Sequence, residues 1–543
     1  MEAQTALADA AHGCGPTRRG ARIASVWAAD SGFSGGFAAD ADGCEVFAQP
    51  PPRARSEVRA WLSRLSGAFA IAFSPAPGRL LLACDALGQR SLYYSLLADG
   101  RVVFGSTLRG VLDTGLVARR LRRATVPYFL TFAYVPGAHT LVEGVFALPP
   151  GCMLEATASG LHIEPFWSLP ATPAKFRGEA ELTAQLREAL DGAVARALPP
   201  AADGVGVTLS GGIDSSLVLA IARRRFSGPM HCYSVSFGPE HANELAFSGM
   251  VAEHTGVPQV IVEISPAHVV AELDATVAAL SQPNGDPLTV PNTLLFRRAA
   301  ADSCVLLNGE GGDPCFGGPK NAPMLLAELL GSGAPESSDG FERARSYLRA
   351  HQKCYDDLPH MLAPALREEL SSLAMEREVS GWLDDPRWPS LLDKLMAINV
   401  AWKGAYHILP KVDHLSFGSG VCARSPLFDR RIVELSFQIP AGSKRKGAVE
   451  KHLLKQAVSD LLPRAILDRP KSGMLVPVEA WFRGPLRQFA RERLLEGLAP
   501  WELFDRRWLE AIIDGKLPGL RPRRGVKIWL LLTLEAWLRG VLR

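Results

Sequence analysis

The sequence predicts an α/β protein in two parts, a β-rich N-terminal domain of the α+β class and a larger domain built on a parallel sheet. In residues 1–167, short apolar runs follow one another with turn residues between them, which is typical of antiparallel strands in a sandwich. In residues 175–543, strand-like and helix-like runs alternate, which predicts a parallel sheet with right-handed crossovers and a helical C-terminal part. Two of the strand-like runs end in glycine-rich segments, and ligands bind beyond the carboxyl ends of strands in such sheets.

Length and composition limit the classes of protein to consider. A chain of 543 residues is long enough for two or more domains and a large core. Its 59 Lys and Arg residues nearly balance its 56 Asp and Glu residues, so neither a nucleic-acid partner nor an anionic membrane is expected. Nine cysteines at irregular spacing, with no C-x-x-C pair, favour reduced thiols and a cytoplasmic protein. The first 25 residues show no secretory signal, and the apolar run Ile528–Leu534 is too short for a membrane span.

The N-terminal part contains three clear strand predictions. The runs Leu65–Phe73 and Arg79–Asp85 are apolar and are separated by a turn at Pro75–Gly78. Arg101–Ser106 is a third run of the same kind. A proline-containing, weakly patterned stretch at Trp167–Phe176 places the domain boundary there.

Helix and strand predictions alternate after this boundary. Apolar residues at helical spacing predict a helix over Glu179–Leu198, and β-branched residues predict a buried strand at Val205–Leu209. Further strands are expected at His231–Phe237, Gln259–Ile264 and Cys304–Asn308. Further helices are expected at Glu244–His254, Ala267–Leu280, Pro291–Ala301, Glu450–Pro463 and Ile528–Leu542.

The first glycine-rich segment has the features of an anion site. Ser210–Gly212 follows the strand directly, and its glycines let main-chain N–H groups approach a ligand closely. Ser215 and Ser216 then open a helical pattern, whose free N–H groups and dipole favour negative charge. Asp214 lies at the mouth of this turn, where a carboxylate can hold Mg²⁺. Because no lysine follows the glycines, the segment is not a Walker loop.

Four segments resemble, in the same order, motifs of the asparagine synthetases. SGGIDSS (Ser210–Ser216) is similar to the pyrophosphate-binding loop of the ATP pyrophosphatases, which cut ATP into AMP and pyrophosphate. The other three are NGEGGDPCFGG (Asn308–Gly318), KVDHLSFGSGVCARSPLFD (Lys411–Asp429) and DRPKSGMLVPVEAWF (Asp468–Phe482). The resemblance implies an adenine-nucleotide α-hydrolase (PP-loop) domain with ATP and Mg²⁺ as cofactors. It also implies nucleotide contacts from Leu209, Ser210, Gly211, Gly212, Asp214, Ser215, Ser216 and Gly309.

The strand that ends at Ser234–Gly238 lies by the adenine in related enzymes. Val235 and Phe237 are therefore implied as adenine contacts. The alternative, that both are plain core residues, is at least as well supported by their apolar character.

The resemblance also implies roles for individual side chains. Asp313 would be the second Mg²⁺ carboxylate opposite Asp214, and two carboxylates on an ion that bridges ATP oxygens neutralise charge as pyrophosphate leaves. Glu310 has the position of the active-site acid, and Lys471 that of a lysine that stabilises charge in the transition state. His407 lies near the position of a family acid and is a candidate base, the alternative being a structural histidine.

The N-terminal part resembles the glutaminase domain of the asparagine synthetases, a class II glutamine amidotransferase domain of the Ntn type. The similarity is carried by LSGAFAIAF, CDALGQRSLYYS, VFGSTLRGVL and YVPGAHTLVEGVFALPPG. The family's nucleophilic cysteine follows the initiator methionine, but residue 2 here is Glu2, and the nearest thiol is that of Cys14. Cys84 replaces the arginine of the family's RD-x-x-G segment, so Asp85 and Gly88 are expected to be structural. We expect a degenerate, inactive glutaminase that persists as a folded wall.

These features together predict an amide synthetase that forms AMP and pyrophosphate through an acyl-adenylate. With no working glutaminase, the amine should come with a substrate, either a small molecule or a peptide that carries a carboxylate and an amine. β-Lactam synthetases and lasso-peptide cyclases resemble this layout, which favours natural-product lactam or peptide macrolactam formation, with partner proteins of a biosynthetic pathway. One alternative is an asparagine synthetase that uses free ammonia, and Cys422 in place of a family glutamate argues against it. The other is a non-catalytic ATP-binding scaffold, against which Asp214, Asp313 and Lys471 argue.

Overall fold

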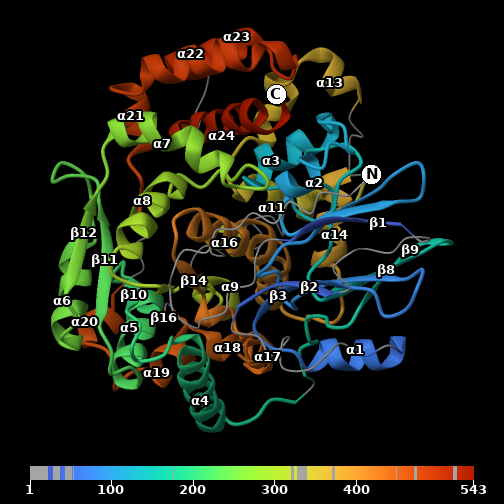
Figure 1. The fold of residues 1–543 in the computed structure, drawn as a ribbon. Coiled ribbons are helices and arrows are strands. Elements are labelled where there is room, and N and C mark those ends of the chain that lie inside the picture. The colour runs from blue at the N-terminus through green and yellow to red at the C-terminus, as the bar shows by residue number, and fades with distance from the viewer. Residues whose placement is uncertain are drawn as a thin grey trace.

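The computed structural model describes most of the chain. The described residues are 23–28, 37–42, 52, 54–173, 175–318, 323–326, 339–369, 374–447, 449–469, 474–517 and 523–543. The antiparallel strands of the N-terminal part lie on one side of the molecule and the parallel strands on the other (Figure 1). The C-terminal helices α22 (Arg487–Gly497), α23 (Arg506–Asp514) and α24 (Arg524–Trp537) lie together across one end.

The N-terminal part is a sandwich of two antiparallel sheets, as its sequence predicts. One sheet has the strand order β1 (Ala24–Trp27), β6 (Val102–Gly105), β5 (Tyr93–Leu96), β7 (Phe146–Ala147). The other has the order β2 (Phe37–Asp42), β3 (Ala68–Phe73), β4 (Leu80–Cys84), β8 (Cys152–Thr157), β9 (Gly160–Pro165).

Strand β3 shows why this sandwich forms. All its side chains are buried, and they alternate between two cores because successive side chains of a strand point to opposite faces. Ala70 and Ala72 belong to the core shared with the other sheet, which also contains Phe104 of β6. Phe69 and Phe73 belong to a second core with Trp61 of α1 (Arg55–Arg64). The helix therefore covers the outer face of the second sheet, which explains an uninterrupted apolar run.

The larger part contains a five-stranded parallel sheet, as predicted from the alternation of strands and helices. Its strand order is β12 (Gln259–Glu263), β11 (Met230–Ser236), β10 (Val205–Thr208), β13 (Val305–Leu307), β14 (Cys422–Arg424). Strands β10 and β13 are neighbours although two strands lie between them in the chain, so the direction of winding reverses there. A crevice at such a reversal is the usual ligand site of an open α/β sheet.

Helices cover both faces of the parallel sheet. One core joins β10 to α4 (Glu179–Ala197), α5 (Ile213–Arg225) and α6 (Leu245–Thr255). The opposite core joins β11 to α7 (Pro266–Ala278), α8 (Thr289–Ala300) and α24. None of the helices in the described ranges combines the length and the apolar run that a membrane span requires.

The remaining elements are mostly short helices between and after these layers. Those of the N-terminal part are α2 (Leu108–Leu112) and α3 (Val126–Phe132). Those between β13 and β14 are α9 (Gly312–Phe316), α11 (Glu342–Ala350), α12 (Leu358–Met361), α13 (Pro364–Glu369), α14 (Ala374–Leu383), α15 (Leu391–Ile398), the π-helix Asn399–Ile408 and α16 (Leu409–Gly418). Those that follow β14 are α17 (Arg430–Gln438), α18 (Ala441–Lys444), α19 (His452–Ala457), α20 (Arg464–Leu467) and α21 (Val478–Arg483).

One predicted helix begins and ends elsewhere than expected. The helix predicted over Glu450–Pro463 is α19, which spans only His452–Ala457. Glu450 instead belongs to the strand β16 (Val449–Glu450), which pairs with β15 (Arg445–Lys446). Between β16 and α19, Lys451 takes a left-handed conformation with φ +53°, which ends the strand and turns its side chain inwards. The helix was therefore confirmed but its predicted bounds were wrong, and at its start the contacts of Lys451 with two distant carboxylates outweigh the local helical pattern.

The two parts of the chain pack against each other through polar contacts. Arg90 Nη1 lies 2.6 Å from Asp413 Oδ1 of α16, and both side chains are buried. Trp167 Nε1 donates to Glu434 Oε1 of α17 at 2.8 Å. The division of the chain at residues 167–175 remains a prediction, but the contacts show that residues on either side of it form one packed interface.

Candidate active site

The first glycine-rich segment connects β10 to α5 in a tight turn. Gly211 has φ +75°, and a Cβ added to it would lie 2.6 Å from the backbone nitrogen of Ser248. Ser210 N donates to Ser215 Oγ at 3.1 Å, which holds the turn against the first turn of the helix. The N-cap of α5 is Gly212, which has no side chain to cap the helix's first N–H groups. The end of α5 is therefore suited to bind an anionic group such as a phosphate.

The second glycine-rich segment packs directly on the first. A Cβ added to Gly309 would lie 2.5 Å from the backbone nitrogen of Ser215, and one added to Gly312 would collide with the carboxylate of Asp214. Only glycine allows this approach, because any other side chain would separate the two loops. The spacing of glycines in both segments thus follows from the contact between them.

The two predicted metal-binding carboxylates meet at one point. Lys451 Nζ lies 2.5 Å from Asp214 Oδ2 and 2.6 Å from Asp313 Oδ1. All three side chains are largely buried, with Lys451 only 2% exposed. The carboxylates come from the first turns of α5 and α9, which follow the neighbouring strands β10 and β13. The structure therefore brings Asp214 and Asp313 together at the winding reversal of the sheet.

This arrangement fits a divalent cation. Two carboxylate oxygens that face one cation position are the ligands that Mg²⁺ takes from proteins, while phosphate oxygens and water complete its coordination. In the structure the positive charge at this position is the ammonium of Lys451. Asp214 and Asp313 are thus the residues that would hold Mg²⁺.

A buried ion pair lies beside the predicted acid. Lys411 Nζ is 2.6 Å from Asp286 Oδ2, and the Lys411 side chain is 2% exposed. Burial opposes ionisation of Asp286, but the nearby charge of Lys411 lowers the pKa of Asp286 below its usual value. Burial likewise opposes the charge of Lys411, but the carboxylates of Asp286 and Glu310 raise the pKa of Lys411. Asp286, Glu310 and Lys411 therefore form one charged cluster.

His407 lies next to this cluster on the π-helix Asn399–Ile408. Its ring stacks on that of Tyr134 from the N-terminal part, with centroids 5.1 Å apart. Its backbone oxygen accepts a hydrogen bond of 2.8 Å from Asn284 Nδ2. Burial, with a smaller opposing effect of Asp286, lowers the pKa of His407 well below its usual value, so the ring is neutral. Within the described residues its buried Nδ1 has no hydrogen-bond partner, which leaves a basic nitrogen available to a ligand.

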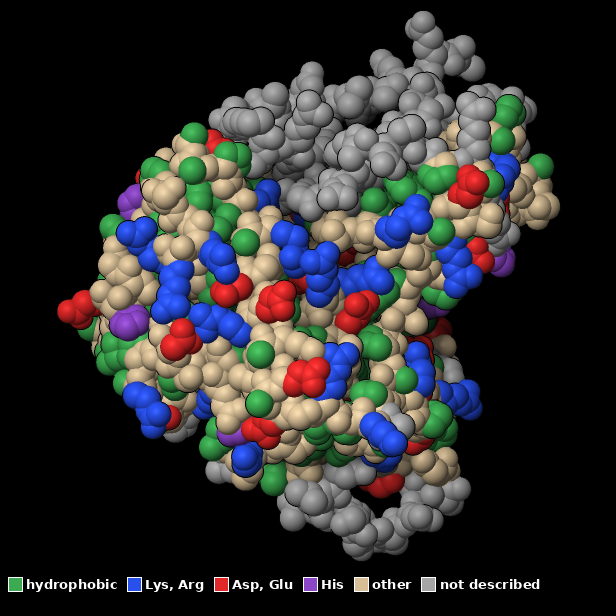
Figure 2. All heavy atoms as spheres, turned by 90° about the horizontal axis from the view of Figure 1, so that it is seen from below, with side chains coloured by type: hydrophobic (Ala, Val, Ile, Leu, Met, Phe, Trp, Pro, Cys, Tyr) green, Lys and Arg blue, Asp and Glu red, His purple; other side chains and the backbone are tan. Residues whose placement is uncertain are grey.

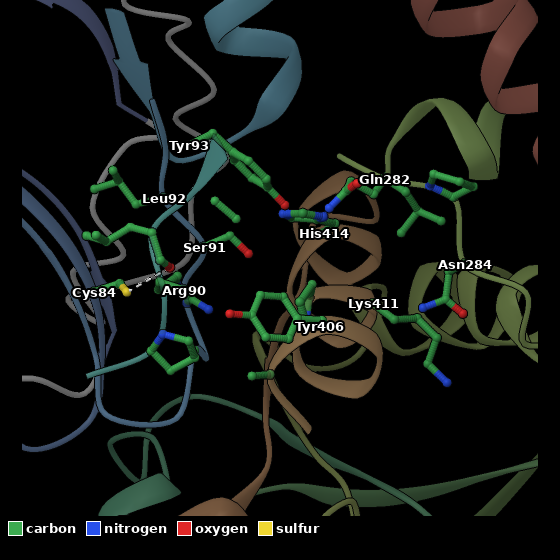
Figure 3. A pocket seen from close by; sticks show the side chains of 18 residues that line it. Cys84, Arg90, Ser91, Leu92, Tyr93, Gln282, Asn284, Tyr406, Lys411 and His414 are labelled. Carbon is green, nitrogen blue, oxygen red and sulfur yellow. Dashed lines mark hydrogen bonds between the residues drawn. The ribbon is translucent and has the colours of Figure 1, made fainter. Parts of the chain in front are cut away.

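Tyr406, the neighbour of His407, lies in a different environment. It lines a small cavity of about 30 Å³ between the two parts of the chain. In Figure 3 its ring extends towards Arg90 and Cys84 of the N-terminal part, whereas Lys411 points away from them. His407, and not Tyr406, therefore lies beside the charged cluster.

The remaining predicted residues have mixed outcomes. Val235 and Phe237 are buried in the core, and the Phe237 ring contacts that of Trp481 edge to face at 5.7 Å. The structure gives both residues a packing role, and an adenine contact remains a prediction. Lys471 lies outside the described residues. Nearby, Arg469 Nη1 donates to the backbone oxygen of Gly211 at 3.3 Å, so the segment that leads to Lys471 reaches the first loop.

Three residues of this site were not identified from the sequence. The pattern around Lys451 predicts a helix, Lys411 lies within a motif that assigns it no role, and Tyr134 belongs to the N-terminal part. No local pattern distinguishes these side chains, because their partners are far away in the chain. Lys451 is separated from Asp214 by 237 residues, for example.

Comparisons with known proteins agree with this geometry. The family model described as asparagine synthase matches residues 185–539, and that of a glutamine amidotransferase domain matches residues 53–167. Asparagine synthetase (glutamine-hydrolyzing) 1 of Bacillus subtilis (strain 168) is 24% identical over 504 residues, which cover 88% of this chain and 78% of that protein. A putative asparagine synthetase (glutamine-hydrolyzing) of Mycobacterium tuberculosis (strain ATCC 25618 / H37Rv) is 27% identical over 468 residues, 79% of this chain and 70% of that protein. The carboxyethyl-arginine beta-lactam-synthase of Streptomyces clavuligerus is 25% identical over 336 residues, 61% of this chain and 52% of that protein.

Proposed function

Because this chain belongs to the asparagine synthase family, it is a carbon–nitrogen ligase, and we propose that it forms an amide through an acyl-adenylate with release of pyrophosphate. The observation that carries this proposal is the meeting of Asp214 and Asp313 at one cation position beside the uncapped N-terminus of α5. A triphosphate bound at this helix end would have its leaving pyrophosphate next to that position.

In the first step, a substrate carboxylate attacks the α-phosphorus of ATP and pyrophosphate leaves. The N–H groups at the start of α5 would bind the phosphates, and Asp214 and Asp313 would hold Mg²⁺. Bound Mg²⁺ supplies positive charge where negative charge develops on the leaving group. Lys471 is proposed to add to this stabilisation, as the family motif implies.

In the second step, an amine attacks the activated carbonyl carbon, a C–N bond forms and AMP leaves. The amine must lose a proton, and the acceptor we propose is Nδ1 of His407, which is buried beside the charged cluster and has no hydrogen-bond partner among the described residues. Glu310, with Lys411 and Asp286 beside it, is proposed to orient the amine. The burial of Lys411 and His407 keeps water away from this region, which protects an intermediate that water would hydrolyse.

We propose that the N-terminal part has only a structural role, packed against the synthetase part, and that the amine is part of a substrate. The carboxylate of Asp85 accepts hydrogen bonds from the backbone N–H groups of Phe69, Leu87, Gln89 and Arg90. We infer that it holds a loop in place rather than binding glutamine. Burial raises the pKa of the Cys84 thiol well above its usual value, which disfavours the nucleophilic thiolate. Glu2 and Cys14 lie outside the described residues.

The product class that we propose is a lactam or a peptide macrolactam. The beta-lactam-synthase among the relatives supports ring closure, since an amine and a carboxylate in one molecule need no separate ammonia source. The proposal of a peptide macrolactam, as lasso-peptide cyclases make, rests on the order of a degenerate glutaminase domain and a synthetase domain in the sequence. The asparagine synthetase alternative remains disfavoured by Cys422, which lies buried on β14 where the family has a glutamate.

Exchange of labelled pyrophosphate into ATP tests the proposed function. We expect exchange that depends on a carboxylate and on Mg²⁺ when the chain is given a panel of amino acids, diamino acids and peptides. Formation of asparagine from aspartate and ammonium would favour the asparagine synthetase alternative. Absence of exchange with every member of the panel would favour the non-catalytic scaffold.

Glutamine should not serve as a nitrogen source. We expect incubation of the intact chain with glutamine to release no more ammonia and glutamate than a buffer control, because burial disfavours the nucleophilic thiolate of Cys84. The measurement is glutamate formation followed by an enzyme-coupled assay, with the Cys84→Ser variant as a control. A glutaminase rate above background would contradict the proposal that the amine comes with a substrate.

A further inference from the structure

A second cavity lies between the two parts of the chain. It has a volume of about 300 Å³. The end of α1, the end of α4, the start of α17 and the loop after β4 line it, and Glu310 and His407 do not. Figure 2 shows the face of the molecule on which α1, α4 and α17 lie in Figure 1, with Lys and Arg side chains gathered near its middle. We call this cavity the interdomain cleft.

The interdomain cleft carries an excess of positive charge. Among the residues that the structure describes, six arginines and four carboxylates line it. Three arginines are neutralised by carboxylates of the same cleft, since Arg90 pairs with Asp413, Arg196 with Asp429 and Arg430 with Glu434. Of the other three, Arg64 and Arg431 are exposed and have no carboxylate within 4.0 Å among the described residues.

The third of these arginines lies at the end of a strand of the parallel sheet. Arg424 is the last residue of β14, and its Nη1 donates to the backbone oxygen of Ala197 at 2.9 Å. Its own backbone oxygen accepts a hydrogen bond from the backbone nitrogen of Asn308, the first residue of the second glycine-rich segment. The positively charged wall of the cleft is thus joined to the sheet edge that carries the proposed active site.

The cleft also has apolar lining residues and a buried hydroxyl group. Leu409, Val412 and Ala423 are buried there. Ser425 is 6% exposed, and its hydroxyl has no hydrogen-bond partner in the described part of the chain. A buried hydroxyl without a partner costs about 1–3 kcal/mol, and a ligand that accepts a hydrogen bond would remove that cost. The cleft therefore offers guanidinium groups, one hydroxyl donor and an aliphatic surface.

We propose that the interdomain cleft binds an organic carboxylate of amino-acid to dipeptide size. Guanidinium groups bind carboxylates through paired charge-assisted hydrogen bonds, and Arg64 and Arg431 have this capacity unused by neighbouring carboxylates. The apolar lining residues accommodate an aliphatic part, which inorganic phosphate lacks. This site is distinct from the adenylation site and goes beyond the function proposed above.

Equilibrium binding to the intact chain tests this proposal. Titration calorimetry with N-acetyl-L-leucine, N-acetyl-L-leucinamide and inorganic phosphate separates the contributions of the carboxylate and of the aliphatic part. We expect the carboxylate to bind at least about tenfold more tightly than the uncharged amide and than phosphate. The double variant Arg64→Gln/Arg431→Gln should weaken binding of the carboxylate about tenfold or more.

The matched control is Arg507→Gln. Arg507 is an exposed arginine on α23, at the opposite end of the molecule in Figure 1. Its substitution by glutamine should leave the affinity for N-acetyl-L-leucine unchanged. No binding of N-acetyl-L-leucine by the native chain up to about 10 mM would overturn the proposal. Equal affinities of the native chain and the double variant would overturn the location of the site. Tighter binding of phosphate than of N-acetyl-L-leucine would overturn the class of ligand.

Discussion

Asp214→Asn is expected to lower carboxylate-dependent pyrophosphate exchange by about 10³-fold or more while the chain stays folded. The amide has the same shape as the carboxylate, so the close packing of Gly312 on this side chain is retained. It has no negative charge, however, and cannot attract a cation together with Asp313. Exchange rates and thermal unfolding of the native chain and the variant, measured at equal Mg²⁺ concentration, check both parts of this expectation.

Asp460→Asn is the matched control for this substitution. Asp460 is 58% exposed and pairs with Arg187 at the surface, where an ion pair contributes little. Its exchange rate should equal that of the native chain. Asp313→Asn should have the same effect as Asp214→Asn, and the double variant should be no slower than either, because both carboxylates serve one position. An Asp214→Asn variant within about threefold of the native rate would refute the two-carboxylate site.

Lys411→Met is expected to lower the free energy of unfolding by about 3–5 kcal/mol. The substitution removes the positive charge that lies 2.6 Å from Asp286 and leaves a buried carboxylate without its counter-ion. Methionine has a similar length, so the loss reflects charge rather than a cavity. Urea unfolding at neutral pH measures the effect, and pyrophosphate exchange should fall as well because Glu310 loses the same partner.

The pH dependence of this difference follows from the direction of two pKa shifts. The pKa of Asp286 is lowered on folding, so its contribution is present above the unfolded value of about 3.9 and is lost as the pH falls below it. The pKa of Lys411 is raised on folding, so its contribution is present below about 10.4 and is lost as the pH rises above that value. The destabilisation by Lys411→Met should therefore be present at neutral pH and shrink in acid, where Asp286 is protonated.

The double variant Asp286→Asn/Lys411→Met provides the control. It removes both charges, and replacement of a whole buried pair by neutral groups is often close to neutral in stability. We expect it to recover most of the stability lost in Lys411→Met. A loss below about 1 kcal/mol in the single variant, or no recovery in the double variant, would show that the pair does not stabilise the fold through charge.

Much of the fold could be predicted from local patterns in the sequence. The apolar run Val205–Leu209 is a strand because its β-branched side chains favour a buried sheet, and β10 spans all but its last residue. The glycines of both loops were recognised because such residues permit close approach of the backbone. The structure adds the reason for their positions, since Gly309 and Gly312 face the first turn of α5. These features depend on residues within a few positions of one another.

The candidate site could be predicted only in part. Asp214, Asp313, Glu310 and His407 were identified from motifs, and the structure places the first two at one point and the other two beside one buried ion pair. The predicted start of the helix at Glu450 was wrong. The local pattern favours a helix through Lys451, but two distant carboxylates attract its ammonium group. The roles of Lys471, Val235 and Phe237 stay predictions.

The sequence by itself determined the family, the parallel sheet and the two loops that meet at its centre, because glycine spacing and apolar periodicity are local properties of the chain. Only the tertiary structure decided which charges become neighbours. Lys451 lies between Asp214 and Asp313, and Arg90 of the N-terminal part meets Asp413 across 323 residues of sequence. Electrostatic attraction depends on separation in space and on burial. For residues far apart in the chain, local sequence patterns give neither quantity.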